Sequence, residues 1–147
     1  MQPIYISGRV VHGDRYGQRL GFPTANLDRR MFARQRAKIR LGIYAGYAFV
    51  PFRPRRAGAD KSGRDKFFAG ARNGQRHKAA IVIGPLDKSG LPKLEAHLIG
   101  FSGDLYGKKM VLILRQFLRP FKIFNAAALL RKQIRADIAA ARRLRLP

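Results

Sequence analysis

The chain has 147 residues and contains no cysteine. Without a thiol it can form no disulfide scaffold, no thiolate metal site and no cysteine nucleophile. No apolar run approaches the roughly 20 residues that a membrane-spanning helix needs. Residues 1–10 also lack the basic segment and apolar core of a secretory signal peptide. With this length, these absences predict one soluble, cytoplasmic domain over residues 1–147 that makes no membrane contact.

Acidic residues are scarce. The chain has 8 Asp and Glu against 31 Lys and Arg, which gives a net charge of +23 and a pI near 11.7. A field of this sign attracts polyanions, including nucleic acid, acidic lipid and nucleotide phosphates. Because charge alone does not choose among them, non-specific polyanion binding is an expectation without a defined partner.

Several familiar functional motifs are missing. The sequence has no Gly-x4-Gly-Lys-Ser/Thr, so the common phosphate-binding loop is absent. It has no His-Glu-x-x-His, and its three histidines are scattered, which makes a histidine metal site a weak hypothesis. The function must therefore depend on other residues.

Short segments rich in β-branched and aromatic residues predict an antiparallel β structure, either a barrel or a sandwich. In one of them Leu94, Ala96 and Leu98 alternate with Glu95 and His97, as in a strand with one buried face. The predicted strands are 4–11, 42–50, 79–83, 93–101 and 110–118.

The C-terminal segment predicts an amphipathic helix that packs on the β structure. Apolar residues recur there at helical spacing, and most of the basic residues fall on the other side. Asn125 is the expected N-cap. The apolar positions are Ala127, Leu130, Ile134, Ile138 and Ala141.

Two segments interrupt this pattern. Residues 28–40 predict either a short helix or a basic loop. Residues 51–78 are rich in Gly, Arg and Lys with little apolar periodicity, so we expect a long, mobile loop there.

The most distinctive stretch is residues 13–26. It contains three glycines within residues 13–21, which we call the glycine segment, and it ends in Pro-Thr-Ala-Asn. If Thr24 and Asn26 are extended, their side chains leave the chain on the same face. Neutral oxygen ligands suit Mg²⁺ when substrate phosphates supply the negative charge, and backbone N–H groups of the glycine segment could cradle those phosphates. The simpler alternative is a hairpin with turn glycines. The glycines are Gly13, Gly17 and Gly21.

Glu95 is one of only eight acidic residues and lies in a strand with apolar neighbours. By position alone it reads as a surface carboxylate paired with one of the many Lys or Arg side chains.

Taken together, these pieces resemble the riboflavin kinase family. The segments GRVVHGDRYGQRLGFPTANL, GIYAG, LEAHLIGFSGDLYGKK and FLRPFKIF, followed by a helix, occur in the family's order. The resemblance runs from about residue 4 to residue 142, with 51–78 unmatched. Pro-Thr-Ala-Asn after Leu-Gly-Phe is its most specific part.

The resemblance implies a six-stranded antiparallel Greek-key barrel with a C-terminal helix. It implies transfer of the ATP γ-phosphate to the ribityl 5′-hydroxyl of riboflavin, which gives FMN and ADP, by a cytoplasmic monomer. Thr24 and Asn26 would hold the Mg²⁺ of the nucleotide, and Gly13, Gly17 and Gly21 would belong to the loop around its phosphates. Glu95 would be the catalytic base. Asp104, Tyr106 and Arg119 would form the flavin-side wall together with the start of the helix.

The sequence departs from the family pattern in two places. Many members carry Asn-Ile-Gly and Pro-Thr-Phe ahead of the acidic strand, whereas this chain reads Val82-Ile83-Gly84-Pro85-Leu86-Asp87. Phe121 replaces the glutamate that often follows Arg-Pro. Bacterial relatives often carry an N-terminal FMN adenylyltransferase module, which we do not expect in this chain. Two alternatives stay open: a basic barrel that binds RNA or DNA, and an inactive relic of the kinase fold that binds flavin.

Overall fold

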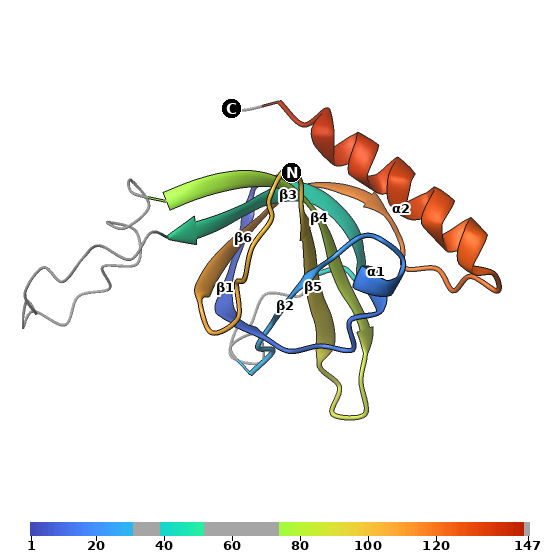
Figure 1. The fold of residues 1–147 in the computed structure, drawn as a ribbon, viewed down its shortest axis with the longest axis horizontal. Helices are drawn as coiled ribbons and strands as arrows, with labels where there is room; N and C mark the ends of the chain where they lie inside the picture. The colour runs from blue at the N-terminus through green and yellow to red at the C-terminus, as the bar shows by residue number, and fades with distance from the viewer. Residues whose placement is uncertain (31–38, 52–73, 146–147) are drawn as a thin grey trace, which may run out of the picture.

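Six antiparallel strands close into a barrel, and one long helix lies against its outer surface (Figure 1). The computed structural model describes residues 1–30, 39–51 and 74–145. Neighbouring strands follow the order β1-β2-β5-β4-β3-β6 around the barrel, which confirms the fold class. The elements are β1 (Ile4–Val11), α1 (Tyr16–Arg19), β2 (Ala25–Leu27), β3 (Gly42–Pro51), β4 (Gly74–Leu86), β5 (Pro92–Leu98), β6 (Lys109–Arg119) and α2 (Ala127–Arg142).

Alternating side chains fill the barrel. In β5, Leu94, Ala96 and Leu98 are buried in the core, whereas the residues between them face outward, as the sequence predicted. Burial of one such Leu or Ile side chain contributes about 1.5–3 kcal/mol. The largest fully buried side chains are Ile6, Leu27, Ile81, Ile83, Leu94, Met110, Leu112 and Leu114.

Strand β4 is longer than the predicted strand 79–83. Its first residues, 74–78, pair with the end of β3, from Pro51↔Gly74 to Tyr47↔Lys78. Figure 1 shows this end of the hairpin extending away from the barrel. Since Gln75 and Arg76 are exposed there, this part has no apolar pattern by which the sequence could reveal it. The loop expected over 51–78 is therefore shorter at this end, and residues 52–73 lie outside the described part of the chain.

Strand β2 has only three residues, yet it joins β1 to β5 and closes the barrel. The glycine segment before it contains α1, a single helical turn that the sequence did not predict. Gly21 follows this turn with a φ of 89°, a left-handed conformation that glycine adopts without strain.

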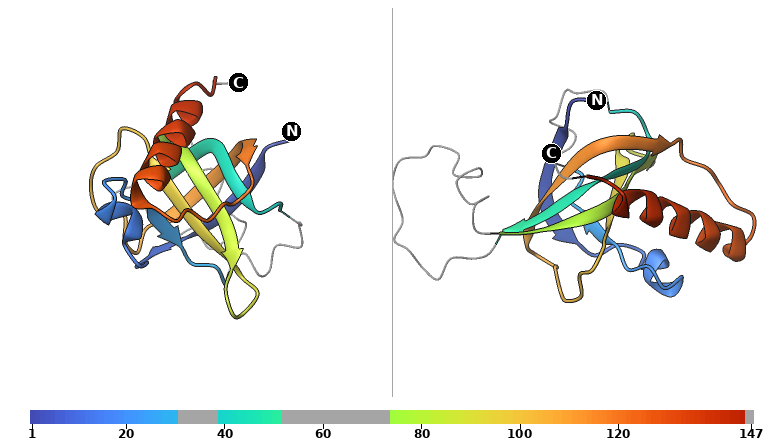
Figure 2. Two further views of the ribbon diagram at one scale, coloured as in Figure 1. Left: turned by 90° about the vertical axis from the view of Figure 1, so that its right-hand side faces the viewer. Right: turned by 90° about the horizontal axis from the view of Figure 1, so that it is seen from above.

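Helix α2 packs against β3 and β4 (Figure 2). Ile138 and Ala141 are buried against Ala45 and Ala80, a directly paired couple of small residues that lets the helix approach closely. The helix begins one residue later than predicted, because Ala126 is the N-cap and makes no side-chain capping hydrogen bond. None of the helices in the described ranges is long and apolar enough to cross a membrane.

Candidate active site

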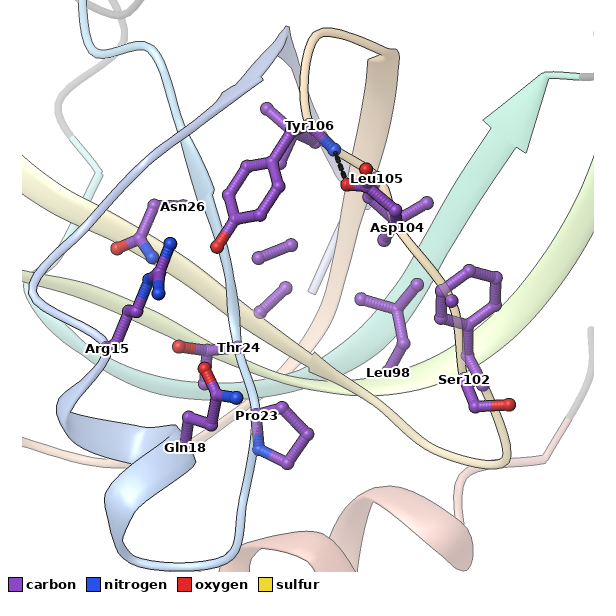
Figure 3. Close-up of a pocket in the computed structure, with 15 residues that line it drawn as sticks. Arg15, Gln18, Pro23, Thr24, Asn26, Leu98, Ser102, Asp104, Leu105 and Tyr106 are labelled. Carbon is purple, nitrogen blue, oxygen red and sulfur yellow. Dashed lines mark hydrogen bonds between the residues drawn. The ribbon is translucent and has the colours of Figure 1, made fainter.

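The pairing of β2 with β5 places Asn26 directly opposite Glu95. The neighbours Ala25 and Ala96, also paired, belong to the barrel core. Since side chains alternate along a strand, Asn26 and Glu95 both leave the barrel on its outer face. Thr24 immediately precedes β2, and Figure 3 shows its side chain in the cavity that Asn26 also lines.

Two glycines of the glycine segment, Gly13 and Gly17, lie close to Asn26 and Thr24. A Cβ at Gly13 would fall 2.4 Å from the Asn26 carboxamide. A Cβ at Gly17 would fall 2.6 Å from the Phe22 carbonyl oxygen and 3.4 Å from the Thr24 hydroxyl. A larger residue at Gly13 would therefore displace the Asn26 carboxamide, a candidate metal ligand, and one at Gly17 would displace the Phe22 carbonyl next to Thr24.

A first cavity, which we call the loop-side cavity, has a volume of about 400 Å³. It lies between the glycine segment, β2 and the loop that joins β5 to β6 (Figure 3). The hydroxyl end of Tyr106 points toward the side where Asn26 and Thr24 lie. The polar side chains of its lining are Arg15, Gln18, Thr24, Asn26, Ser102, Asp104 and Tyr106.

The loop from β5 to β6 is attached to the glycine segment. The Tyr106 ring stacks on His12 with 3.8 Å between ring centroids, and His12 directly precedes Gly13. The backbone N–H of Tyr106 donates a hydrogen bond to Asp104 Oδ1 at 2.9 Å. The Tyr106 side of the loop-side cavity is thus held against the start of the glycine segment.

A second cavity, which we call the helix-side cavity, has a volume of about 410 Å³ and lies under α2. Thr24 lines it as well as the loop-side cavity. Its lining is mostly apolar, and Leu130 and Ile134 from α2 are part of it. Glu95, with 14% of its side chain exposed, and Arg119 provide charged groups. The apolar lining includes Leu20, Phe22, Ile43, Val82, Phe121, Ile123, Phe124, Leu130, Ile134 and Ile138.

Arg119 connects the end of β6 to α2. Its Nε donates to Asp137 Oδ1 at 3.0 Å and its Nη2 to Oδ2 at 2.7 Å, a bidentate pair. Gln133 donates a further hydrogen bond to Oδ1 of this carboxylate, which is 7% exposed. Sequence reasoning missed Asp137, although an acid on the apolar side of an arginine-rich helix was a signal for a buried ion pair.

Lys93 connects Glu95, the candidate catalytic base, to Asp14 in the glycine segment. Its Nζ lies 3.0 Å from Glu95 Oε1 and 3.1 Å from Asp14 Oδ2. Burial alone would lower the pKa of Lys93, but the two carboxylates outweigh it and the pKa is raised. The pKa of Asp14 is lowered, first by a hydrogen bond from the Tyr16 backbone N–H and then by Lys93. Sequence reasoning did not identify Lys93, but its position two residues before Glu95 in an alternating strand was the available signal.

The structure brings Glu95 of β5 next to Thr24 and Asn26, which lie about 70 residues earlier in the chain. It does not group the expected flavin wall: Asp104 and Tyr106 line the loop-side cavity, whereas Arg119 lines the helix-side cavity. Gly13 and Gly17 contact Asn26 and Thr24, while a Cβ at Gly21 would meet nothing within 4 Å. The two departures from the family pattern, Val82 and Phe121, both line the helix-side cavity.

Comparison with known proteins gives a consistent result. The family model described as riboflavin kinase matches residues 1–145. The chain is 31% identical to the human riboflavin kinase over 99% of its own length and 83% of that protein. It is 33% identical to the bifunctional riboflavin kinase/FMN adenylyltransferase of Pseudomonas fluorescens, of which it covers 40%. It therefore spans less than half the length of this bacterial relative.

Solved structures support the same fold. A riboflavin kinase from Trypanosoma brucei superposes with a TM-score of 0.62 at 23% identity, over 97% of this chain and 79% of that one. A protein from Streptococcus pneumoniae titled macrolide-efflux protein gives 0.71 at 23% identity, over 97% of this chain and 40% of that one. With the family model and the human relative, the sequence match shows that the chain belongs to the riboflavin kinase family.

Proposed function

We propose that this protein transfers the γ-phosphate of ATP to the ribityl 5′-hydroxyl of riboflavin, giving FMN and ADP. The observation that carries the proposal is the position of Glu95. Its carboxylate lines an apolar cavity large enough for a small organic molecule, directly across the sheet from Asn26. A candidate base for one substrate and candidate ligands for the other thus lie on neighbouring strands.

The nucleotide binds in the loop-side cavity in this proposal. Gly13 and Gly17 allow the backbone to lie against Asn26 and Thr24, where phosphates would contact backbone N–H groups. Asp104 and Tyr106 border the same cavity, so we assign them to the nucleotide side rather than to the flavin.

The donor set fits a magnesium ion. Thr24 and Asn26 offer a hydroxyl and a carboxamide oxygen from one cavity wall, and Mg²⁺ takes such oxygens while substrate phosphates complete its shell. When bound, the ion would neutralise charge on the phosphate oxygens. Thr24 and Asn26 would hold it, and Gly13 and Gly17 would leave room for it.

Riboflavin binds in the helix-side cavity. The rings of Phe22, Phe121 and Phe124 offer aromatic surface to a flat heterocycle, and Arg119 offers a cation at the same cavity. The ribityl chain would then extend toward Glu95 and Thr24, where the two cavities share a wall.

Glu95 acts as the general base. As the hydroxyl oxygen forms its bond to the γ-phosphorus, the bond from phosphorus to the bridging oxygen breaks and ADP leaves. The hydroxyl proton passes to the Glu95 carboxylate and then to solvent. Lys93 keeps the carboxylate oriented through the 3.0 Å contact.

The direct test is incubation of the purified protein with riboflavin, MgATP and no other enzyme, followed by chromatography of the flavins. We expect FMN and an equal amount of ADP, with no product from heat-denatured protein. Riboflavin binding without FMN formation would instead support the inactive flavin-binding relic. Absence of both would reject the proposal.

A further inference from the structure

Helix α2 carries two groups of basic residues on one flank, one in its middle and one at its C-terminal end. At about 100° per residue, its four basic residues and the C-cap residue fall within an arc of about 120°. The arc lies beside the face formed by Ile134, Ile138 and Ala141, which packs toward the barrel. We call these residues the basic stripe: Arg131, Lys132, Arg135, Arg142 and the adjoining C-cap residue Arg143.

The stripe is not neutralised within the described part of the chain. Asp137 is the one acid of α2, and it is buried and paired with Arg119 from β6. No described residue forms an ion pair with the side chains of Arg131, Lys132, Arg142 or Arg143, and four of the five basic side chains are exposed.

Alanines fill the same flank, so no bulky group stands between the cations. Ala128, Ala136 and Ala139 are exposed and project near the stripe. From Arg131 to Arg142 the helix rises about 16 Å at 1.5 Å per residue. Figure 2 shows this helix on the outside of the barrel. The result is an exposed flank on which anionic groups can approach the cations.

The chemistry of the stripe selects among polyanions. A membrane-surface helix inserts an apolar face into the lipid, but the apolar face of α2 packs on the barrel and Leu129 is its one exposed large apolar side chain. A single-stranded nucleic acid is bound largely by stacking on aromatic rings, and α2 has no aromatic residue. A double helix offers exposed phosphates at high density and releases more counterions per contact than a single strand.

We propose that the basic stripe binds the phosphate backbone of double-helical nucleic acid, without reading its sequence. This interaction is separate from the two cavities and does not depend on the kinase activity.

The test measures binding of the whole chain to a fluorescent duplex of about 20 base pairs between about 50 and 200 mM salt, where each neutralised phosphate adds about 0.9 to the slope of log affinity against log salt. The stripe variant is Arg131→Gln/Lys132→Gln/Arg143→Gln. The matched control, Lys88→Gln/Lys108→Gln/Arg115→Gln, removes the same charge from β6 and two loops. A further variant, Ala139→Glu, adds an acid among the cations while keeping a good helix former.

We expect the stripe variant to reduce the slope by about 2.7 and the control to reduce it by less than about 1. Ala139→Glu should weaken duplex binding with unchanged far-ultraviolet circular dichroism. The proposal fails if both triple variants reduce the slope of log affinity against log salt by the same amount, since binding would then depend on net charge alone. It also fails if a single strand of equal length, or vesicles containing phosphatidylserine, bind the stripe more tightly than the duplex.

Discussion

At the scale of single residues, Thr24 occupies the position where the two cavities meet. Its hydroxyl is the group that the proposal assigns to the metal of the nucleotide, whereas its methyl group adds only volume. Thr24→Val removes the hydroxyl and keeps the shape. We expect the KM for MgATP to rise about tenfold or more, the effect of about 1.4 kcal/mol, with riboflavin affinity changed much less, because the valine keeps the shape of the wall. Steady-state kinetics and flavin fluorescence titration measure the two quantities.

Thr24→Ser is the matched control, because it restores the hydroxyl without the methyl group. It should keep an MgATP KM close to that of the wild type. If Thr24→Val saturates with MgATP as the unmodified protein does, the metal assignment is wrong.

Gly13 and Gly21 of the glycine segment are required for different reasons: one for lack of space, the other for its backbone conformation. Gly13 has no room for a Cβ because the Asn26 carboxamide lies 2.4 Å from its position, so Gly13→Ala must displace a candidate ligand. Gly21 has open space but a φ of 89°. We expect Gly13→Ala to impair use of MgATP with little loss of stability. Gly21→Ala should instead cost about 1–2 kcal/mol of unfolding free energy and keep the KM for MgATP. Kinetics beside urea unfolding distinguish them, and identical behaviour would contradict the assignment.

At the scale of elements, the Arg119–Asp137 pair attaches α2 to the barrel over the helix-side cavity. Asp137→Asn leaves the Arg119 guanidinium without its counter-charge in a largely buried place. We expect a loss of about 2–3 kcal/mol in unfolding free energy, below the full cost of a completely buried pair because Arg119 is 20% exposed. Riboflavin affinity should fall too, since the cavity wall loosens.

Asp87→Asn provides the control, since Asp87 forms a more exposed pair with Arg29. Asp87→Asn should lower the unfolding free energy by clearly less than Asp137→Asn does, because solvent screens the more exposed pair. Urea denaturation of both variants checks the contrast, and equal losses would show that the Arg119 pair contributes no more than a surface contact.

The sequence predicted the elements whose side chains alternate or repeat regularly. Strand β5 and the apolar face of α2 were found because one side of each is buried and the other is not. Strand β2 was missed as an element because three residues are too few to show a period, and the start of β4 because it extends past the core.

The candidate site was predictable only in part for a related reason. Thr24, Asn26 and Glu95 lie in distinctive local motifs, so the resemblance to the riboflavin kinase family could identify them as candidate site residues. The contacts of Lys93 with Asp14, and of Arg119 with Asp137, join residues distant in the chain. Nothing in local sequence specifies such pairs, because they depend on how the closed barrel aligns its strands and places α2.

At the scale of the whole molecule, barrel closure places one cavity on each side of Thr24. The short strand β2 carries Asn26 into register with Glu95 of β5, so a metal-ligand candidate and a base candidate face outward side by side. Each cavity alone could bind a ligand. Our central claim is that phosphoryl transfer takes place where they meet, with Glu95 as the proton acceptor.

Single-turnover formation of FMN by Glu95→Gln tests this claim most directly. The substitution keeps the shape and hydrogen-bonding capacity of the side chain but removes its basicity. We predict a fall in the rate of about 10²–10⁴-fold, with riboflavin affinity changed only modestly and the fold intact. Asp87→Asn, an acid-to-amide change outside both cavities, should keep the wild-type rate. A Glu95→Gln rate within about threefold of the wild type would contradict the account, because alignment of the phosphate alone would then supply the catalysis.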